Sequence, residues 1–182
     1  MLSEKINEEQ LGDCLERIYN GDETAFKELY DISAFHIYRF ALSIVKYSYL
    51  AEEVTQETFL NIMVHCQTHP IRKPKSWLFT VVKNCCLKAL KEEHLSQKED
   101  LDLYKEQLIS CDNTETTDTP LREIPAVQSL DEQEFQLVLL CKLEGLTIPQ
   151  AAKILKMNRI RARSKYDYAI KKIKRYYRER GD

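Results

Sequence analysis

Apolar residues recur at helical spacing along most of this 182-residue chain, and few of its residues could break a helix. The chain holds only 4 Gly and 5 Pro, whereas Leu, Ile, Lys and Glu are frequent. One apolar stripe with nearly helical spacing consists of Phe26, Leu29, Tyr30, Ile37, Ala41 and Val45. This composition favours helices over a β-sandwich. The sequence therefore predicts an all-α fold.

The first half of the chain predicts a small helical bundle. Helices are expected over about 8–19, 22–45, 50–66 and 75–93. Asp22 is a suitable cap for the second helix, and Pro70 and Pro74 place a loop before the fourth. The side chain of Trp77 is expected in the core, because large aromatic residues are usually buried.

The middle of the chain has a different character. Residues 95–127 show weak periodicity and contain the run DNTETTDTP together with Pro120 and Pro125. Such a segment predicts an acidic linker, with a short helical stretch near 101–108 at most. The expected organisation is therefore two small helical domains, 1–94 and 128–182, joined by a linker over 95–127.

The last quarter of the chain carries clear helix start signals. Ser129 with Glu132, and Thr147 with Gln150, each have the spacing of a capping box. The first would open a helix that ends before Gly145. The second would open a short helix followed by a tight turn, after which Asn158 caps a long final helix rich in Arg and Lys. Two helices joined by such a turn predict a helix-turn-helix domain.

Charge is distributed very unevenly, although the formal net charge is only −2. Residues 92–134 hold 13 acidic and 3 basic side chains, whereas residues 151–182 hold 12 basic and 3 acidic ones. Residues 67–91 hold 6 basic side chains and no acidic one. Two basic blocks around an acidic one favour a polyanionic ligand that is contacted twice. The alternatives are solvated helix faces and an αα-hairpin with a basic exposed face.

Enzyme and metal chemistry find little support in the sequence. With 4 Gly, no phosphate-binding Gly-rich loop is possible, and the 4 His stand without partners at a readable spacing. His65, Cys66 and His69 lack a second ligand pair, so neither zinc nor any other cofactor is expected. The polar, acidic start MLSEKINEEQ and the absence of a long apolar run predict a cytoplasmic protein with reduced cysteines and no membrane insertion.

Two strings resemble a known family. AEEVTQETFL at 51–60, followed by KSWLFTVVKN at 75–84, resembles the second domain of bacterial RNA polymerase sigma factors. The segment that begins EFQLVLLCKLEGLT and continues through the final helix resembles their fourth domain. Two such domains without a third between them resemble the extracytoplasmic-function class. The resemblance covers about 22–177 and implies a non-catalytic protein that directs transcription initiation at promoters.

The resemblance also implies partners and sites. The polar face of the AEEVTQETFL helix would bind the clamp helices of the polymerase β′ subunit through Glu52, Glu53, Gln56 and Glu57. The loop over 69–75 and the helix after it would bind the promoter minus-ten element through Arg72, Lys73, Lys75, Lys83, Asn84, Lys88 and Lys91. The final helix would bind the minus-thirty-five element through Arg159, Arg161, Arg163, Ser164, Lys165 and Tyr168.

The fourth domain of the family also docks on the flap of the β subunit, and an anti-sigma protein is a common further partner. This sequence departs from the family at Lys88 and at Lys91 with Glu92, where an Asp and an Arg pair are common. It also departs at Ile160, Arg161 and Ala162, where a Gly-Thr-Val run is usual. Promoter preference therefore cannot be copied from a relative. Two other functions stay open: a free-standing helix-turn-helix regulator that binds duplex DNA without polymerase, and an interaction module that has lost DNA binding.

Overall fold

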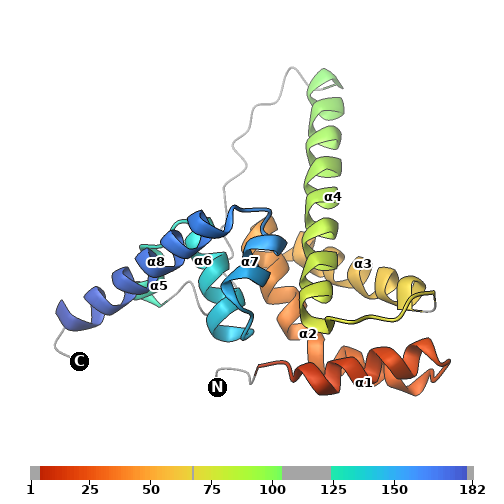
Figure 1. Ribbon diagram of the computed structural model, residues 1–182. Coiled ribbons are helices and arrows are strands. Elements are labelled where there is room, and N and C mark those ends of the chain that lie inside the picture. Colours follow the sequence, from red (N-terminus) through yellow and green to blue (C-terminus); the bar gives the residue numbers. More distant parts are fainter. Residues whose placement is uncertain (1–4, 67, 104–123, 180–182) are drawn as a thin grey trace.

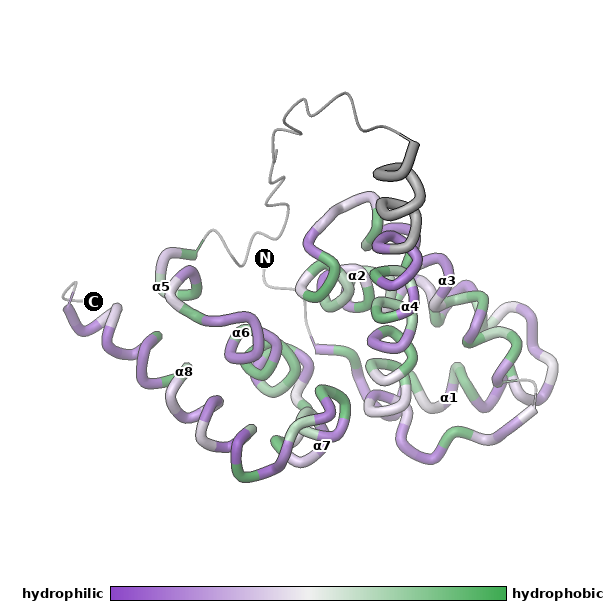
Figure 2. The backbone as a smooth tube through the Cα atoms, turned by 90° about the horizontal axis from the view of Figure 1, so that it is seen from above, coloured by the Kyte–Doolittle hydropathy of each residue, from purple (hydrophilic) through white to green (hydrophobic). Residues whose placement is uncertain are grey.

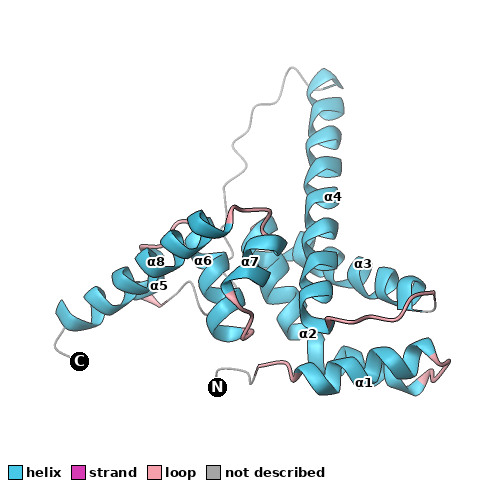
Figure 3. Ribbon diagram, in the orientation of Figure 1, coloured by secondary structure: helices cyan, strands magenta, loops and turns pink. Residues whose placement is uncertain are grey.

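The computed structural model describes residues 5–66, 68–103 and 124–179, and for 95–103 the backbone only. Over these residues the chain consists of helices, turns and loops without any strand (Figure 3). The predicted all-α fold is confirmed.

The amino-terminal bundle comprises α1 (Glu8–Tyr19), α2 (Thr24–Val45), α3 (Ser48–Cys66) and the first half of α4 (Pro74–Leu103). These four helices pack around one apolar core (Figure 1). Phe40 of α2 and Phe79 of α4 are fully buried and meet edge to face, with ring centroids 5.3 Å apart. Such a pair adds to the stability that burial of apolar surface already gives.

Local signals explain the starts of these helices. The Asn7 side chain accepts hydrogen bonds from the backbone N–H groups of Glu9 and Gln10, which caps α1. The Asp22 carboxylate accepts from the backbone N–H of Thr24, at 2.9 Å, and from its hydroxyl. Hydrogen bonds from Thr24 and Arg17 lower the pKa of Asp22 to about 2. Asp22 thus fixes the start of α2, as the sequence predicts, from one residue before the cap position Glu23.

The fourth helix is longer than the sequence pattern suggests. The apolar periodicity ends near 93, whereas α4 continues to Leu103 and extends beyond the rest of the molecule (Figure 1). The expected end at about 93 is wrong because periodicity reports only the part of a helix that packs against a core. Residues 94–103 contain neither Gly nor Pro, so nothing local ends the helix there. Residues 104–123 of the expected linker lie outside the described residues.

The carboxyl-terminal bundle contains α5 (Pro125–Gln128), α6 (Glu132–Val138), η1 (Leu139–Leu143), α7 (Ile148–Ile154) and α8 (Arg159–Glu179). The capping box that opens α6 is formed by Asp131 and Glu134, so the expected box of Ser129 and Glu132 is wrong. Ser129 instead follows the short helix α5. Both pairs have the required spacing in sequence. Pro125 starts the short helix α5, and Ser129 is the residue that ends it. The cap of α6 therefore falls at Asp131, two residues later than expected.

The predicted helix-turn-helix is confirmed in α7 and α8. The Gln150 side chain accepts from the backbone N–H of Thr147 at 2.8 Å, as the capping box requires. The Asn158 side chain accepts from the backbone N–H of Ile160 at 2.8 Å and caps α8. Between the helices, Lys156 adopts a positive φ of 53° in the tight turn. Figure 2 shows α8 as a mostly hydrophilic tube, and only Ala162 and Ala169 of this helix are buried.

The two bundles are in direct contact, which the sequence did not predict. Helix α2 contacts α6, and α4 contacts α7. Buried apolar residues of both bundles belong to one continuous core. At this boundary the Gln136 side chain donates to the carbonyl of Ser43 at 3.2 Å, and Lys46 pairs with Glu132 at 3.0 Å. The contact decides which charged faces of the molecule are open to a ligand.

Candidate polymerase and nucleic-acid interfaces

The outward face of α3 is acidic and polar. Glu52, Glu53 and Gln56 are exposed, while the opposite face of the helix packs into the bundle through residues such as Val54 and Ile62. No positively charged side chain lies on this helix apart from the titratable His65. An acidic helix face favours a basic protein surface and repels DNA.

The same face also presents apolar side chains that the sequence reasoning missed. Leu60 is 58% exposed and Val64 is 69% exposed. Leu60 lines a surface hollow together with Glu53, Gln56 and Glu57. Met63 is 39% exposed as well. The sequence did contain a signal for this exposure. Leu60 and Val64 are four residues apart, so they share a helix face, and that face differs from the one on which the buried Val54 and Ile62 lie.

Glu57 is only half-buried and already has partners. Its carboxylate lies 3.3 Å from the Lys88 amine of α4 and accepts from the Asn61 amide at 3.2 Å. The hydrogen bond from Lys88 to Glu57 raises the pKa of Lys88. One predicted polymerase contact and one predicted minus-ten contact are therefore joined to each other. Their pairing links α3 to α4 at the place where the two predicted interfaces meet.

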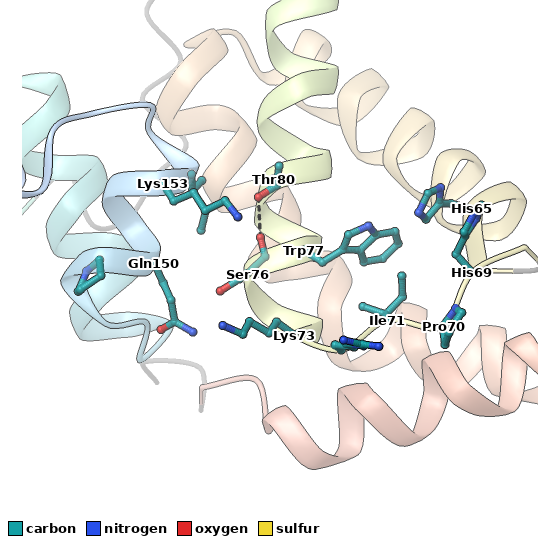
Figure 4. A pocket seen from close by; sticks show the side chains of 13 residues that line it. His65, His69, Pro70, Ile71, Lys73, Ser76, Trp77, Thr80, Gln150 and Lys153 are labelled. Atoms are coloured by element: carbon teal, nitrogen blue, oxygen red, sulfur yellow. Dashed lines mark hydrogen bonds between the residues drawn. The ribbon is translucent and has the colours of Figure 1, made fainter.

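The loop before α4 lies beside a cavity of about 740 Å³. Three rings stack along one wall: the His65 ring lies 5.2 Å from the His69 ring and 5.5 Å from the Trp77 ring, with small interplanar angles (Figure 4). Arg72 and Lys73 of the loop also line this cavity and are exposed. Flat rings beside cations are the groups that bind an unstacked nucleobase and its phosphates.

The structure places Trp77 differently from the expected core position. Its ring packs partly against the core but is only half-buried, because one face lies against His65 in the cavity wall. The His65 and His69 rings stack on each other, while the Cys66 thiol is fully buried and burial raises its pKa to about 11. Across the part of the chain that the structure describes, no three His, Cys, Asp or Glu side chains are grouped as metal ligands.

The remaining predicted minus-ten residues do not form one open face. Asn84, Lys88 and Lys91 are exposed on α4. Lys75 is only 8% exposed, and its amine donates to the backbone carbonyl of Glu144 at 3.0 Å. Lys83 is half-buried, and burial together with the nearby Lys156 lowers its pKa. Both lysines lie where the carboxyl-terminal bundle contacts α4.

The predicted minus-thirty-five residues are more accessible. Arg159, Arg161, Arg163, Ser164 and Tyr168 are all exposed on α8. Arg163 pairs with Asp167 one turn further along, at 2.9 Å. A helix whose first turns present Arg side chains outward has the geometry of a recognition helix in the major groove.

Two features of α8 were not foreseen. Lys165 is half-buried and its amine lies 2.6 Å from the carboxylate of Asp131, the residue that caps α6. Burial of Asp131 opposes its ionisation, but the hydrogen bonds from Lys165 and from the backbone of α6 lower its pKa overall. The second feature is Ile160, which is 78% exposed in the first turn of the helix. Its signal in the sequence was an apolar residue between two arginines.

No helix in the described part of the chain is long and apolar enough to cross a membrane. Of the six cysteines in the sequence, Cys14, Cys66, Cys85 and Cys86 are buried free thiols and Cys141 is a half-buried one, whereas Cys111 lies outside the described residues. Burial raises the pKa of Cys86 to about 12. Buried thiols of this kind pack as small apolar groups.

Comparison with known proteins places each bundle in a family. Residues 29–95 match the model of sigma-70 region 2, and residues 126–175 match that of sigma-70 region 4. Together the two matches cover more than half of the chain and occur in the expected order.

Two relatives of this chain are extracytoplasmic-function sigma factors. The chain is 40% identical over 57 residues to the ECF RNA polymerase sigma factor SigM of Bacillus subtilis, which is 31% of this chain and 35% of SigM. It is 26% identical over 156 residues to the ECF RNA polymerase sigma factor BldN of Streptomyces coelicolor, which is 80% of this chain and 58% of BldN. The chain thus matches about a third of one relative's length and somewhat over half of the other's.

Solved structures share the fold. CnrH in complex with the cytosolic domain of CnrY matches 93% of this chain and 98% of its own, with a TM-score of 0.59 and 16% identity. The sigma factor RpoE of Bartonella quintana, in complex with the anti-sigma factor NepR, matches 82% of this chain and 94% of its own, with a TM-score of 0.60 and 16% identity. With a region 2 bundle, a region 4 bundle and relatives of this kind, the chain belongs to the bacterial RNA polymerase sigma factors of the extracytoplasmic-function class.

Proposed function

We propose that this chain binds core RNA polymerase and directs it to promoters that carry two sequence elements. The observation that carries the proposal is the separation of charge over one molecule. An acidic face with apolar side chains lies on α3, while basic residues gather at the cavity before α4 and on α8. A protein surface and two DNA elements would therefore be bound by different faces of the molecule.

The outward face of α3 is the proposed polymerase-binding surface. Glu52, Glu53 and Gln56 provide polar contacts to the β′ clamp helices, and Leu60 and Val64 provide the apolar area that an acidic rim alone would lack. The β flap is the proposed partner of the carboxyl-terminal bundle, and an anti-sigma protein is a proposed regulator. Synthesis of the RNA would be carried out by the polymerase, because the proposed role of this protein is binding.

The stacked rings of the cavity are the proposed binding site for an extruded base of the minus-ten element. Arg72 and Lys73 lie on the same loop and suit the flanking phosphates. Asn84 and Lys91 extend the surface along α4. Arg159, Arg161 and the side chains after them on α8 are the proposed contacts to the minus-thirty-five duplex, where Arg bound to guanine is the commonest specific contact.

The test is transcription in vitro from a fragment library of the source genome, with core polymerase and with or without this chain. New start sites that share two upstream elements support the proposal. The variant Glu53→Lys should lose these starts, because it places a cation on the acidic face of α3. Glu16→Lys is the matched control, since Glu16 is equally exposed but lies on α1, away from the proposed surfaces.

The alternative of a free-standing regulator, which would bind duplex DNA without polymerase, is not favoured by the comparisons. Footprints on duplex DNA in the absence of core polymerase, together with no new start sites in its presence, would favour that function. Start sites that survive Glu53→Lys unchanged would contradict the proposed polymerase-binding surface.

A further inference from the structure

A buried ionic cluster joins the two bundles. Glu144, which follows η1, is fully buried, and its carboxylate lies against two side chains of α2. The Nδ1 atom of His36 lies 2.9 Å from one carboxylate oxygen, and the guanidinium of Arg39 donates to the other. His36 and Arg39 are each only 4% exposed. The partners lie more than a hundred residues apart in the sequence.

Lys75 completes the cluster from α4. Its amine donates to the backbone carbonyl of Glu144, and Lys75 is 8% exposed. The single negative charge of Glu144 is therefore surrounded by cationic or titratable side chains from two helices of the other bundle. A buried charge is tolerated only when it is paired, so this cluster depends on all its members being present.

The bundle contact hides part of the proposed minus-ten surface. The Lys75 amine is already bound to the backbone carbonyl of Glu144, and Lys83 is half-buried against the carboxyl-terminal bundle. Gln150 and Lys153 of α7 form one wall of the cavity whose opposite wall holds Trp77 (Figure 4). A DNA strand that enters this cavity therefore lies directly beside α7.

Two like charges lie near each other at the boundary. Burial lowers the pKa of Lys83, and the positive charge of the nearby Lys156 lowers it further. Within the described residues neither lysine forms an ion pair with a carboxylate. The closed arrangement thus combines the buried cluster and the apolar contacts of the boundary with one pair of like charges.

We infer that the Glu144 cluster is an intramolecular latch, which keeps the free chain closed and covers the part of its proposed minus-ten surface that Lys75 and Lys83 form. The inference rests on the proposed function for the role of that surface, although the closure itself does not. Separating the bundles exposes all members of the cluster to water, together with the apolar side chains at the boundary between the bundles. A partner that binds the two bundles at separate surfaces must break the cluster, and regulation of this chain then acts on that step.

The first test is Glu144→Gln in the full chain, examined by small-angle X-ray scattering and circular dichroism. The amide keeps the shape but leaves Arg39 buried without its counter-charge, so the bundles should separate. We expect a larger radius of gyration with unchanged helix content. Glu132→Gln is the matched control: it makes the same chemical change in an exposed pair of the same boundary and should leave the radius unchanged.

A second variant approaches the latch from the other bundle. Arg39→Gln should open the chain as Glu144→Gln does, and the double variant should open it no further, because both changes remove one shared interaction. Loss of helix content in either variant would overturn the latch, since the cluster would then belong to the core of a single folded unit. A radius of gyration that stays at the wild-type value in both variants would also overturn it.

The third test measures what the closed form hides. The probe is a fluorescently labelled random-sequence single-stranded 20-mer DNA, titrated with wild-type chain and with Glu144→Gln without polymerase. If about a tenth of the wild-type chain is open, opening raises the apparent affinity about tenfold. An expanded variant with no gain in affinity would overturn the masking role. Scattering reports the latch even if no promoter activity is found, so the failure of the two proposals can be told apart.

Discussion

The two proposed DNA-binding surfaces of this sigma factor differ in accessibility, although both are basic in sequence. The surface on α8 is open, with Arg159 and Arg161 exposed in its first turns. The surface at the start of α4 is partly covered, because Lys75 is bound to Glu144 and α7 lines the adjoining cavity. Equal charge in sequence therefore does not mean equal availability to a ligand. The free chain should bind duplex DNA through α8 before it can bind a separated strand at α4.

The largest expected effect is on the open surface. Arg159→Glu combined with Arg161→Glu should weaken binding of the promoter duplex about 100-fold at low salt and flatten the salt dependence by about two charges. The matched control is Lys171→Glu with Lys174→Glu, which makes the same charge change further along α8. Fluorescence anisotropy at several salt concentrations measures both. An equal loss of affinity in the control would mean that only the net charge of α8 determines DNA binding, and that its first turns make no specific contact.

A smaller effect is expected on the covered surface, and it should depend on the latch. Lys83→Gln should leave the affinity of the closed wild-type chain for single-stranded DNA almost unchanged. In the Glu144→Gln background the same substitution should lower the affinity about fivefold, the equivalent of about 1 kcal/mol. A double-mutant cycle measured by anisotropy gives this coupling. An equal loss in both backgrounds would show that Lys83 is already available in the free chain.

Ile160 offers a way to refine what the open surface recognises. An apolar side chain that is 78% exposed at the start of the proposed recognition helix suits the methyl group of thymine. Burying one methyl group contributes about 0.8 kcal/mol, so Ile160→Ala should weaken binding about fourfold. Replacement of thymine by deoxyuridine in the minus-thirty-five duplex should cost the wild type a similar factor and cost Ile160→Ala nothing. If the two changes are additive, Ile160 does not contact a thymine.

The smallest expected effect concerns the pair of Lys165 and Asp131, which partly occupies the open surface. The folded chain lowers the pKa of Asp131, so the pair contributes stability above the ordinary pKa of aspartate and loses it as the pH falls through the lowered value. Asp131→Asn keeps a good helix cap and removes the pair. The difference in unfolding free energy at pH 7 should stay within about 1 kcal/mol, because both side chains are partly solvated.

Denaturant titrations of wild type and Asp131→Asn at pH 7 and pH 3 measure this difference. The two chains should converge at the lower pH, where Asp131 is protonated more often in the unfolded than in the folded chain. A gap that grows on acidification would contradict the assigned direction of the pKa shift.

Local chemistry explains why much of the fold was predictable. The helix-turn-helix, the caps of Asn158 and Thr147, and the range of α1 follow from interactions within a few residues, which sequence spacing reports directly. The errors have the same origin. The end of α4 and the start of α6 were misplaced where local signals gave more than one solution, and packing or a neighbouring turn selected between them.

The sequence alone determined the all-α class, the two helical halves, the acidic face of α3 and the basic face of α8, because periodicity and charge along a helix fix which side chains share a face. Only the tertiary structure decided how the halves meet. Glu144 gave no signal as an isolated acidic residue, and its burial against His36 and Arg39 depends on contacts between residues more than a hundred positions apart. Pairing of charges across a boundary is a property of three-dimensional packing, which spacing along the chain does not encode.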